Sequence, residues 1–132
     1  MWLLDTNAWI GYLNARPSPV KERIKRKPIE TIWLCDIVKA ELYYGAFKSQ
    51  RQSANLTLLR DLFDRFDSLS FDGEAASRCG RIRAELAKKG TPIGPYDLQI
   101  AAIAMAHGLI LVTHNTDEFG RIDGLSLEDW EA

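Results

Sequence analysis

The stretch MWLLDTN, residues 1–7, decides the fold. Its short apolar run stops abruptly at the carboxylate of Asp5, which is typical of a strand buried on both faces. In an open α/β sheet, ligands bind in the crevice outside the carboxyl ends of the strands, so Asp5 would lie where a site forms. The alternative is that Asp5, Thr6 or Asn7 only caps the helix that follows, because all three residue types are good N-caps.

With 132 residues, 46% of them hydrophobic and 27% charged, the chain has the composition of a soluble globular protein. This length predicts a single domain, residues 1–132, with a sizeable core. No apolar run is long enough to span a membrane, and the N-terminus lacks the basic region and cleavage site of a secretory signal, so we expect a cytoplasmic protein. Cys35 and Cys79 lie far apart in the sequence and are expected to be reduced thiols without a catalytic role.

Four further segments are predicted to be strands. Thr31–Cys35 and Leu109–Thr113 are rich in β-branched, aromatic or aliphatic residues, which favours strands. Leu69–Phe71 and Leu125–Leu127 are shorter candidates, the second of them at an edge of the sheet. The helical patterns between these segments are long enough for right-handed crossovers between parallel strands. The sequence therefore predicts an α/β fold with a mainly parallel sheet of four to five strands.

Acidic residues follow several of these predicted elements. Asp36 is expected to cap a helix in which Glu41 lies beside the apolar stripe. A glutamate there is costly unless it is paired or metal-bound, although it could also extend to solvent at the edge of the stripe. Asp97 falls in the first turn of a later helix, after the rigid turn TPIGPY of residues 91–96, where the helix macrodipole alone would favour an acid.

Asp117 and Glu118 come just after the strand Leu109–Thr113. The carboxyl ends of parallel strands meet at one edge of a sheet, so we expect these acids to join Asp5 and Glu41 there. Hard oxygen ligands without an accompanying cysteine or histidine select Mg²⁺ or Mn²⁺. Such ions bind substrate phosphate as well, which points to phosphoryl transfer or phosphodiester hydrolysis.

Basic residues are unevenly placed in a chain whose formal net charge is −1. They could form a phosphate-tracking rim around the acidic centre, although solvated helix faces are the commoner outcome of such charge runs. The clusters are Lys21, Arg23, Lys25, Arg26 and Lys27; Lys48 and Arg51; and Arg78, Arg81, Arg83, Lys88 and Lys89.

Four motifs in this order resemble the PIN-domain ribonucleases and, within them, the VapC toxins of bacterial toxin–antitoxin pairs. The resemblance covers essentially the whole chain. The motifs are LLDTN at residues 3–7, AELYYG at 40–45, PIGPYD at 92–97 with IAA at 100–102, and THNTDEF at 113–119.

The resemblance implies a three-layer α/β/α sandwich and a Mg²⁺- or Mn²⁺-dependent toxic endoribonuclease neutralised by a VapB-type antitoxin. It also implies homodimers, a toxin–antitoxin hetero-octamer, contact with operator DNA only through the antitoxin, and no membrane association. The closest-looking subset of the family cuts transfer RNA in the anticodon stem-loop, which favours initiator tRNA as the substrate.

Carried over by motif, Asp5 and Asp97 would bind the metal, and Glu41 would bind metal or orient the attacking water. Thr6 and Thr113 would assist by hydrogen bonding. The reaction implied is in-line attack by metal-activated water on an RNA phosphodiester, leaving a 5′-phosphate and a 3′-hydroxyl.

The fourth acid is where the chain departs from the commonest family pattern. Many members have an aspartate two residues after the threonine, where this chain has Asn115. An asparagine can position water or phosphate but cannot supply the charge. Members with asparagine there have an acid just before the phenylalanine, which favours Glu118, with Asp117 second.

Two competing functions follow from the same residues. A phosphatase that phosphorylates an aspartate at the end of the first strand needs a second aspartate two residues later, where this chain has Asn7. The other alternative is a catalytically silent PIN-like module that binds RNA or protein. Such a module would be expected to have lost at least one of Asp5, Glu41 and Asp97.

Overall fold

The protein folds around one sheet of five parallel strands. The computed structural model describes residues 1–131; Ala132, the last residue of the predicted domain, lies outside them. The spatial order is β3-β2-β1-β4-β5, with all four pairings parallel. This confirms the predicted α/β class. The strands are β1 (Trp2–Leu4), β2 (Ile32–Cys35), β3 (Asp67–Leu69), β4 (Ile110–Val112) and β5 (Leu127–Glu128).

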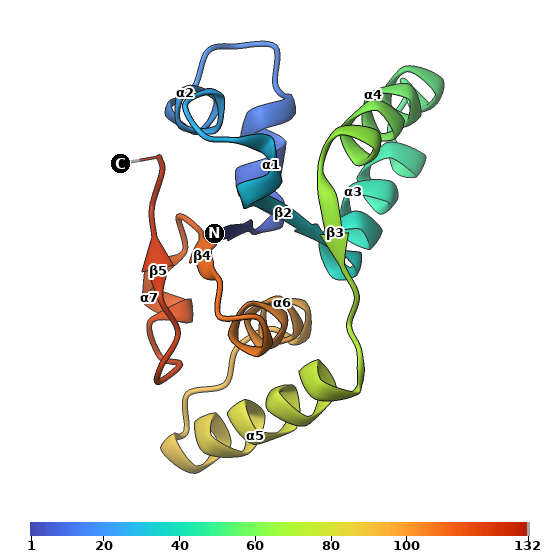
Figure 1. Ribbon diagram of the computed structural model, residues 1–132. Coiled ribbons are helices and arrows are strands. Elements are labelled where there is room, and N and C mark those ends of the chain that lie inside the picture. The colour runs from blue at the N-terminus through green and yellow to red at the C-terminus, as the bar shows by residue number, and fades with distance from the viewer. Residues whose placement is uncertain (132) are drawn as a thin grey trace.

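Helices connect successive strands and cover both faces of the sheet. In Figure 1, α1 and α2 lie on one side of the strands, α5 and α6 lie on the other, and α3 and α4 flank the β2–β3 end. The helices are α1 (Thr6–Leu13), α2 (Pro19–Lys25), the 3-10 turn η1 (Ile29–Thr31), α3 (Asp36–Lys48), α4 (Gln52–Arg65), α5 (Gly73–Lys89), α6 (Pro95–Ala106) and α7 (Thr116–Phe119). Of these described helices, none is long and apolar enough to cross a membrane.

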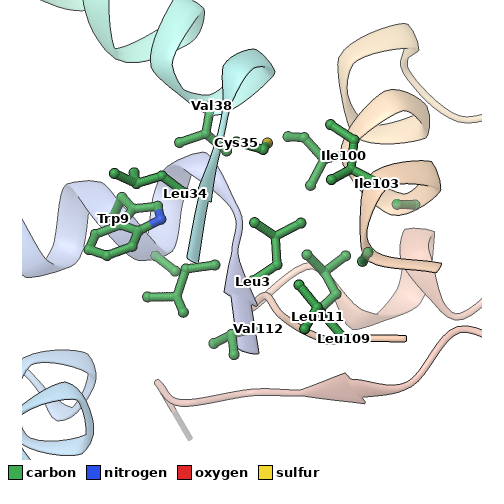
Figure 2. Packing of buried hydrophobic residues seen from close by; sticks show 14 of the residues in the cluster. Leu3, Trp9, Leu34, Cys35, Val38, Ile100, Ile103, Leu109, Leu111 and Val112 are labelled. Atoms are coloured by element: carbon green, nitrogen blue, oxygen red, sulfur yellow. The ribbon is translucent and has the colours of Figure 1, made fainter. Parts of the chain in front are cut away.

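The central strand is buried on both faces, as its apolar run predicts. Leu3 and Leu4 are fully buried. Figure 2 shows Leu3 among side chains from neighbouring strands and from α6, including Leu111 and Ile103. Burial of this apolar surface stabilises the strand that ends at Asp5 and so fixes the position of that carboxylate.

Three local predictions were wrong, and pairing explains two of them. The third strand is Asp67–Leu69 and not Leu69–Phe71, because β2 ends at Cys35, which pairs with Leu69. The last strand is Leu127–Glu128 and not Leu125–Leu127, because β4 ends at Val112, opposite Glu128. Asp36 is not the cap of α3 but its first residue; the N-cap is Cys35, whose side chain makes no capping hydrogen bond.

The strand order places a switch point between β1 and β4. The chain leaves β1 toward β2 on one side and leaves β4 toward β5 on the other. The backbone N–H of Asp5 donates to the carbonyl of Val112 (3.0 Å), so the two strands end side by side. Ligands of open α/β sheets bind at such a point, outside the carboxyl ends of the strands.

Candidate active site

Asp5 lies at the end of β1 and is only 6% exposed. Its Oδ1 accepts the N–H of Ala8 (2.9 Å), so this residue is the N-cap of α1, and of the three caps considered it is the one used. Burial raises the pKa of Asp5, while hydrogen bonds from Thr113 and Ala8 oppose the rise. The charges of Glu131 and Glu41 raise it further. Asp5 therefore caps α1 and is also affected by the charge of neighbouring acids.

Glu41 projects from α3 beside the start of α1. Its Oε1 accepts the hydroxyl of Thr6 at 2.6 Å, and the residue is half-buried. The side chain is therefore held by a neighbour and does not simply extend into solvent. Thr6 immediately follows Asp5, so this hydrogen bond ties α3 to the end of β1.

Thr113 immediately follows β4 and is 1% exposed. Its hydroxyl accepts the backbone N–H of Asn115 (3.0 Å) and also hydrogen-bonds Asp5. Asp5 and Thr113 are the two buried polar residues of the described part of the chain. Both lie at the β1/β4 switch point, the place where open α/β sheets usually bind ligands.

Asp97 approaches these groups from the first turn of α6. Partial burial and, next, the charge of Glu118 raise the pKa of Asp97 to about 6. The charges of Asp5 and Glu41 act in the same direction. The rigid turn before α6 thus delivers this carboxylate to the other acids.

Glu118 lies on α7 and faces the same centre. Its Oε1 accepts the N–H of Gly94 (3.1 Å), and its Oε2 accepts the side-chain amide of Asn115 (2.9 Å). These hydrogen bonds, that of Asn115 first, lower the pKa of Glu118. A Cβ on Gly94 would lie 4.0 Å from both Asp97 Oδ2 and Glu118 Oε1, so the two acids flank this glycine.

Asp117 is exposed, whereas Glu118 is half-buried and its charge is the first among those that raise the pKa of Asp97. Sequence reasoning did not find Gly94, whose backbone N–H binds Glu118, because a backbone donor has no residue signature. It also missed Glu131, whose charge reaches Asp5. His114 is exposed, and its Nδ1 lies 3.0 Å from Asp129 Oδ2 and 3.7 Å from Glu131 Oε2.

The donor set fits a divalent cation. All four side chains of the cluster offer carboxylate oxygens, and none of the four is a cysteine or histidine. Burial is the main cause of the raised pKa values of Asp5 and Asp97, and the charges of neighbouring carboxylates raise both pKa values further. A hard cation with oxygen preference, such as Mg²⁺ or Mn²⁺, would offset this negative charge.

The sequence matches the PIN domain family over residues 2–125. It is 43% identical over 129 residues to a tRNA(fMet)-specific endonuclease VapC of Shigella flexneri, covering 98% of this chain and 97% of that protein. It is 38% identical over 129 residues to a ribonuclease VapC2 of Haemophilus influenzae, with the same coverage. The chain belongs to the VapC ribonucleases of the PIN-domain family.

Solved VapC structures have the same fold. The VapC chain of a DNA-bound VapBC complex from Salmonella typhimurium matches with a TM-score of 0.90 and 42% identity, covering 98% of this chain and 97% of that one. A chain of VapBC-1 from nontypeable Haemophilus influenzae matches with a TM-score of 0.89 and 34% identity, covering 99% and 98%. This VapC ribonuclease thus shares the three-layer sandwich that the motifs implied.

Proposed function

We propose that this chain is the toxin of a VapBC pair and a Mg²⁺- or Mn²⁺-dependent endoribonuclease. The observation that carries the proposal is the convergence of Asp5, Glu41, Asp97 and Glu118 at the β1/β4 switch point. Relatives named as VapC endonucleases and ribonucleases support the activity.

In the proposed site, Asp5 and Asp97 hold the metal, and Glu41 binds metal or orients water. A bound ion would lower the pKa of its water and offset charge on the phosphate. Thr6 holds the Glu41 carboxylate through its hydroxyl, and Thr113 does the same for Asp5. Glu118 is the proposed fourth acid.

We propose transfer RNA as the substrate, with the anticodon stem-loop of initiator tRNA favoured. The name of the Shigella flexneri relative supports this choice. A groove beside Thr6 and Glu41 is also lined by Tyr44, Lys48 and Tyr96. Both tyrosines are exposed, so they could stack on unpaired bases, with Lys48 near the phosphate backbone.

Tyr43 is a poorer candidate for base stacking. Its ring packs against Phe47 and, edge to face, against Phe63. Such contacts stabilise the α3–α4 pair, so the structural role suffices for this tyrosine.

The proposed protein partner is a VapB-type antitoxin, since solved relatives are VapBC complexes. A groove between α1, α3 and α4 is lined by apolar side chains that include Leu13, Leu42 and Leu59. Its rim includes Ile10 and Leu58, both exposed. We propose that antitoxin covers such apolar surface, that the toxin forms homodimers and hetero-oligomers, and that operator DNA is contacted only through the antitoxin.

The test is cleavage of total bacterial tRNA by purified, antitoxin-free protein in Mg²⁺, in EDTA, and with Asp97→Ala, with cut ends mapped by sequencing. We expect discrete cuts in the anticodon stem-loop that vanish with EDTA and with the variant. Absence of cleavage of transfer, ribosomal and messenger RNA by metal-loaded protein would favour the silent binding module instead.

A further inference from the structure

Asn115 connects two parts of the acid cluster: the end of β4, where Thr113 holds Asp5, and α7, which carries Glu118. Its backbone N–H donates to Thr113 Oγ1 (3.0 Å), and that hydroxyl hydrogen-bonds Asp5. Its side-chain amide donates to Glu118 Oε2 (2.9 Å). One residue therefore contacts both the hydroxyl that holds the buried Asp5 and the half-buried Glu118 on α7.

The carboxylate of Glu118 is held at both oxygens. Asn115 binds Oε2, and the N–H of Gly94 binds Oε1 at 3.1 Å. The loop that contains Gly94 is in turn fixed to the segment that follows α7, because the Arg121 guanidinium donates to the carbonyl of Pro92 (3.1 Å). Two donors, one on each oxygen, define the orientation of a planar carboxylate, whereas a single donor would leave it free to rotate.

We propose that Asn115 is a positioning residue that acts through Glu118: its amide, opposite the Gly94 N–H, fixes the Glu118 carboxylate toward Asp97. The Asn115 side chain does this by donating a hydrogen bond. An aspartate at this position has no such donor and would place a second negative charge beside Glu118. The proposal rests on the proposed function for its effect on cleavage, but the contact itself is independent of RNA.

The chemistry of the pair makes this testable by exchange. In the double variant Asn115→Asp/Glu118→Gln, the amide of residue 118 can donate to the carboxylate of residue 115. The carbonyl oxygen of the new glutamine can still accept the Gly94 N–H. The hydrogen bond is restored with donor and acceptor reversed, and the net charge of the site equals that of the wild type.

The first readout is thermal unfolding in EDTA, which needs no activity. We expect Asn115→Asp to lower the Tm by about 2 to 4 °C, because two carboxylates then face each other. The double variant should recover most of that loss. Gln50→Glu, which adds the same charge on the exposed turn between α3 and α4, is the matched control and should leave the Tm unchanged.

The second readout is kcat and KM for one RNA at saturating Mg²⁺. Asn115→Ala should lower kcat by on the order of tenfold with little change in KM, as expected for loss of a hydrogen bond to a charged group. Asn115→Asp should lower kcat further, and the double variant should exceed Asn115→Asp by about tenfold.

Independent, additive effects of the two substitutions on Tm would overturn the inference, as would wild-type kcat in Asn115→Ala. Coupling in Tm without cleavage by the wild type would uphold the contact and refute the proposed function. Cleavage by the wild type without any coupling in Tm would uphold the proposed function and refute the contact between Asn115 and Glu118.

Discussion

The two halves of the acid cluster are held by different parts of the structure. Asp5 is buried at the end of the central strand, and a backbone N–H at the start of α1 binds it. Glu118 lies on the four-residue helix α7, and donors from Asn115 and Gly94 bind it near solvent. Burial in the core fixes the first carboxylate, whereas hydrogen bonds from Asn115 and from the more distant Gly94 fix the second.

This difference has an electrostatic consequence. Burial raises the pKa of Asp5, while hydrogen bonds lower that of Glu118. Between them, Asp97 has a pKa of about 6 because it is partly buried and faces Glu118. The donors around Glu118 therefore favour its ionised form, whereas burial disfavours the ionised forms of Asp5 and Asp97.

The largest effect is expected in the buried half. Asp5→Asn should reduce RNA cleavage more than about 100-fold, because it removes a proposed metal ligand. Asparagine remains a good N-cap for the Ala8 N–H, so the fold should persist. Single-turnover cleavage measures the loss of activity, and thermal unfolding in EDTA measures whether the fold persists. A Tm well below that of the wild type would mean that the charge, and not only the cap, is needed for folding.

In the exposed half, Glu118→Gln should reduce cleavage by roughly 10- to 100-fold, while Asp117→Asn should stay within about twofold. Glutamine keeps the contact with Gly94 but loses the charge that faces Asp97. Initial rates at saturating Mg²⁺ give the comparison. A larger loss for Asp117→Asn would identify Asp117 as the fourth acid and exclude Glu118.

The hydrogen bond from Thr6 to Glu41 should contribute less. Thr6→Val removes the hydroxyl but keeps the shape, and should lower kcat about tenfold. Thr6→Ser retains a donor and should restore at least half of the wild-type rate. Equal activity of the valine and serine variants would show that Glu41 does not depend on this contact.

The smallest effect concerns the stability of the metal-free protein. The folded-state pKa of Asp97, about 6, lies above its ordinary value of 3.8, so the folded protein binds extra protons between about pH 4 and pH 6. The unfolding free energy should therefore fall as the pH rises through that window. Asp97→Asn should remove this fall and be more stable by about 1 kcal/mol at pH 7.5 in EDTA, after allowance for solvent screening.

Urea unfolding of both proteins at several pH values checks this expectation. Wild-type stability that rises with pH between about 4 and 6, relative to Asp97→Asn, would contradict the raised pKa. Adding Mg²⁺ at pH 7.5 should stabilise the wild type more than the variant, because only the wild type retains the full set of carboxylates.

The sequence predicted the buried half better than the exposed half. An apolar run ending at Asp5 is a strand-end signal that needs no knowledge of distant contacts. The choice between Asp117 and Glu118 stayed open because both residues are acidic and adjacent. It depends on which one α7 turns toward Gly94, a segment 24 residues away in the sequence from Glu118.

Strand bounds were missed for a related reason. β3 and β5 end where their partners end, so their bounds depend on the lengths of β2 and β4 and not on local propensity. The position of Asp97 likewise depends on the direction of the turn before α6, and no hydrophobic periodicity in the sequence specifies that direction. In each case a contact between distant segments decides the outcome.

The most direct test of the central claim is a Mn²⁺ titration in which bound ion, measured by electron paramagnetic resonance, and the rate of RNA cleavage are followed on the same sample. We predict that the cleavage rate rises in step with occupancy in the wild type, and that Asp5→Asn and Asp97→Asn each weaken binding and abolish the rise. Cleavage that persists in EDTA, or Mn²⁺ binding unchanged by both substitutions, would contradict the assignment of the acid cluster as the metal-dependent nuclease centre.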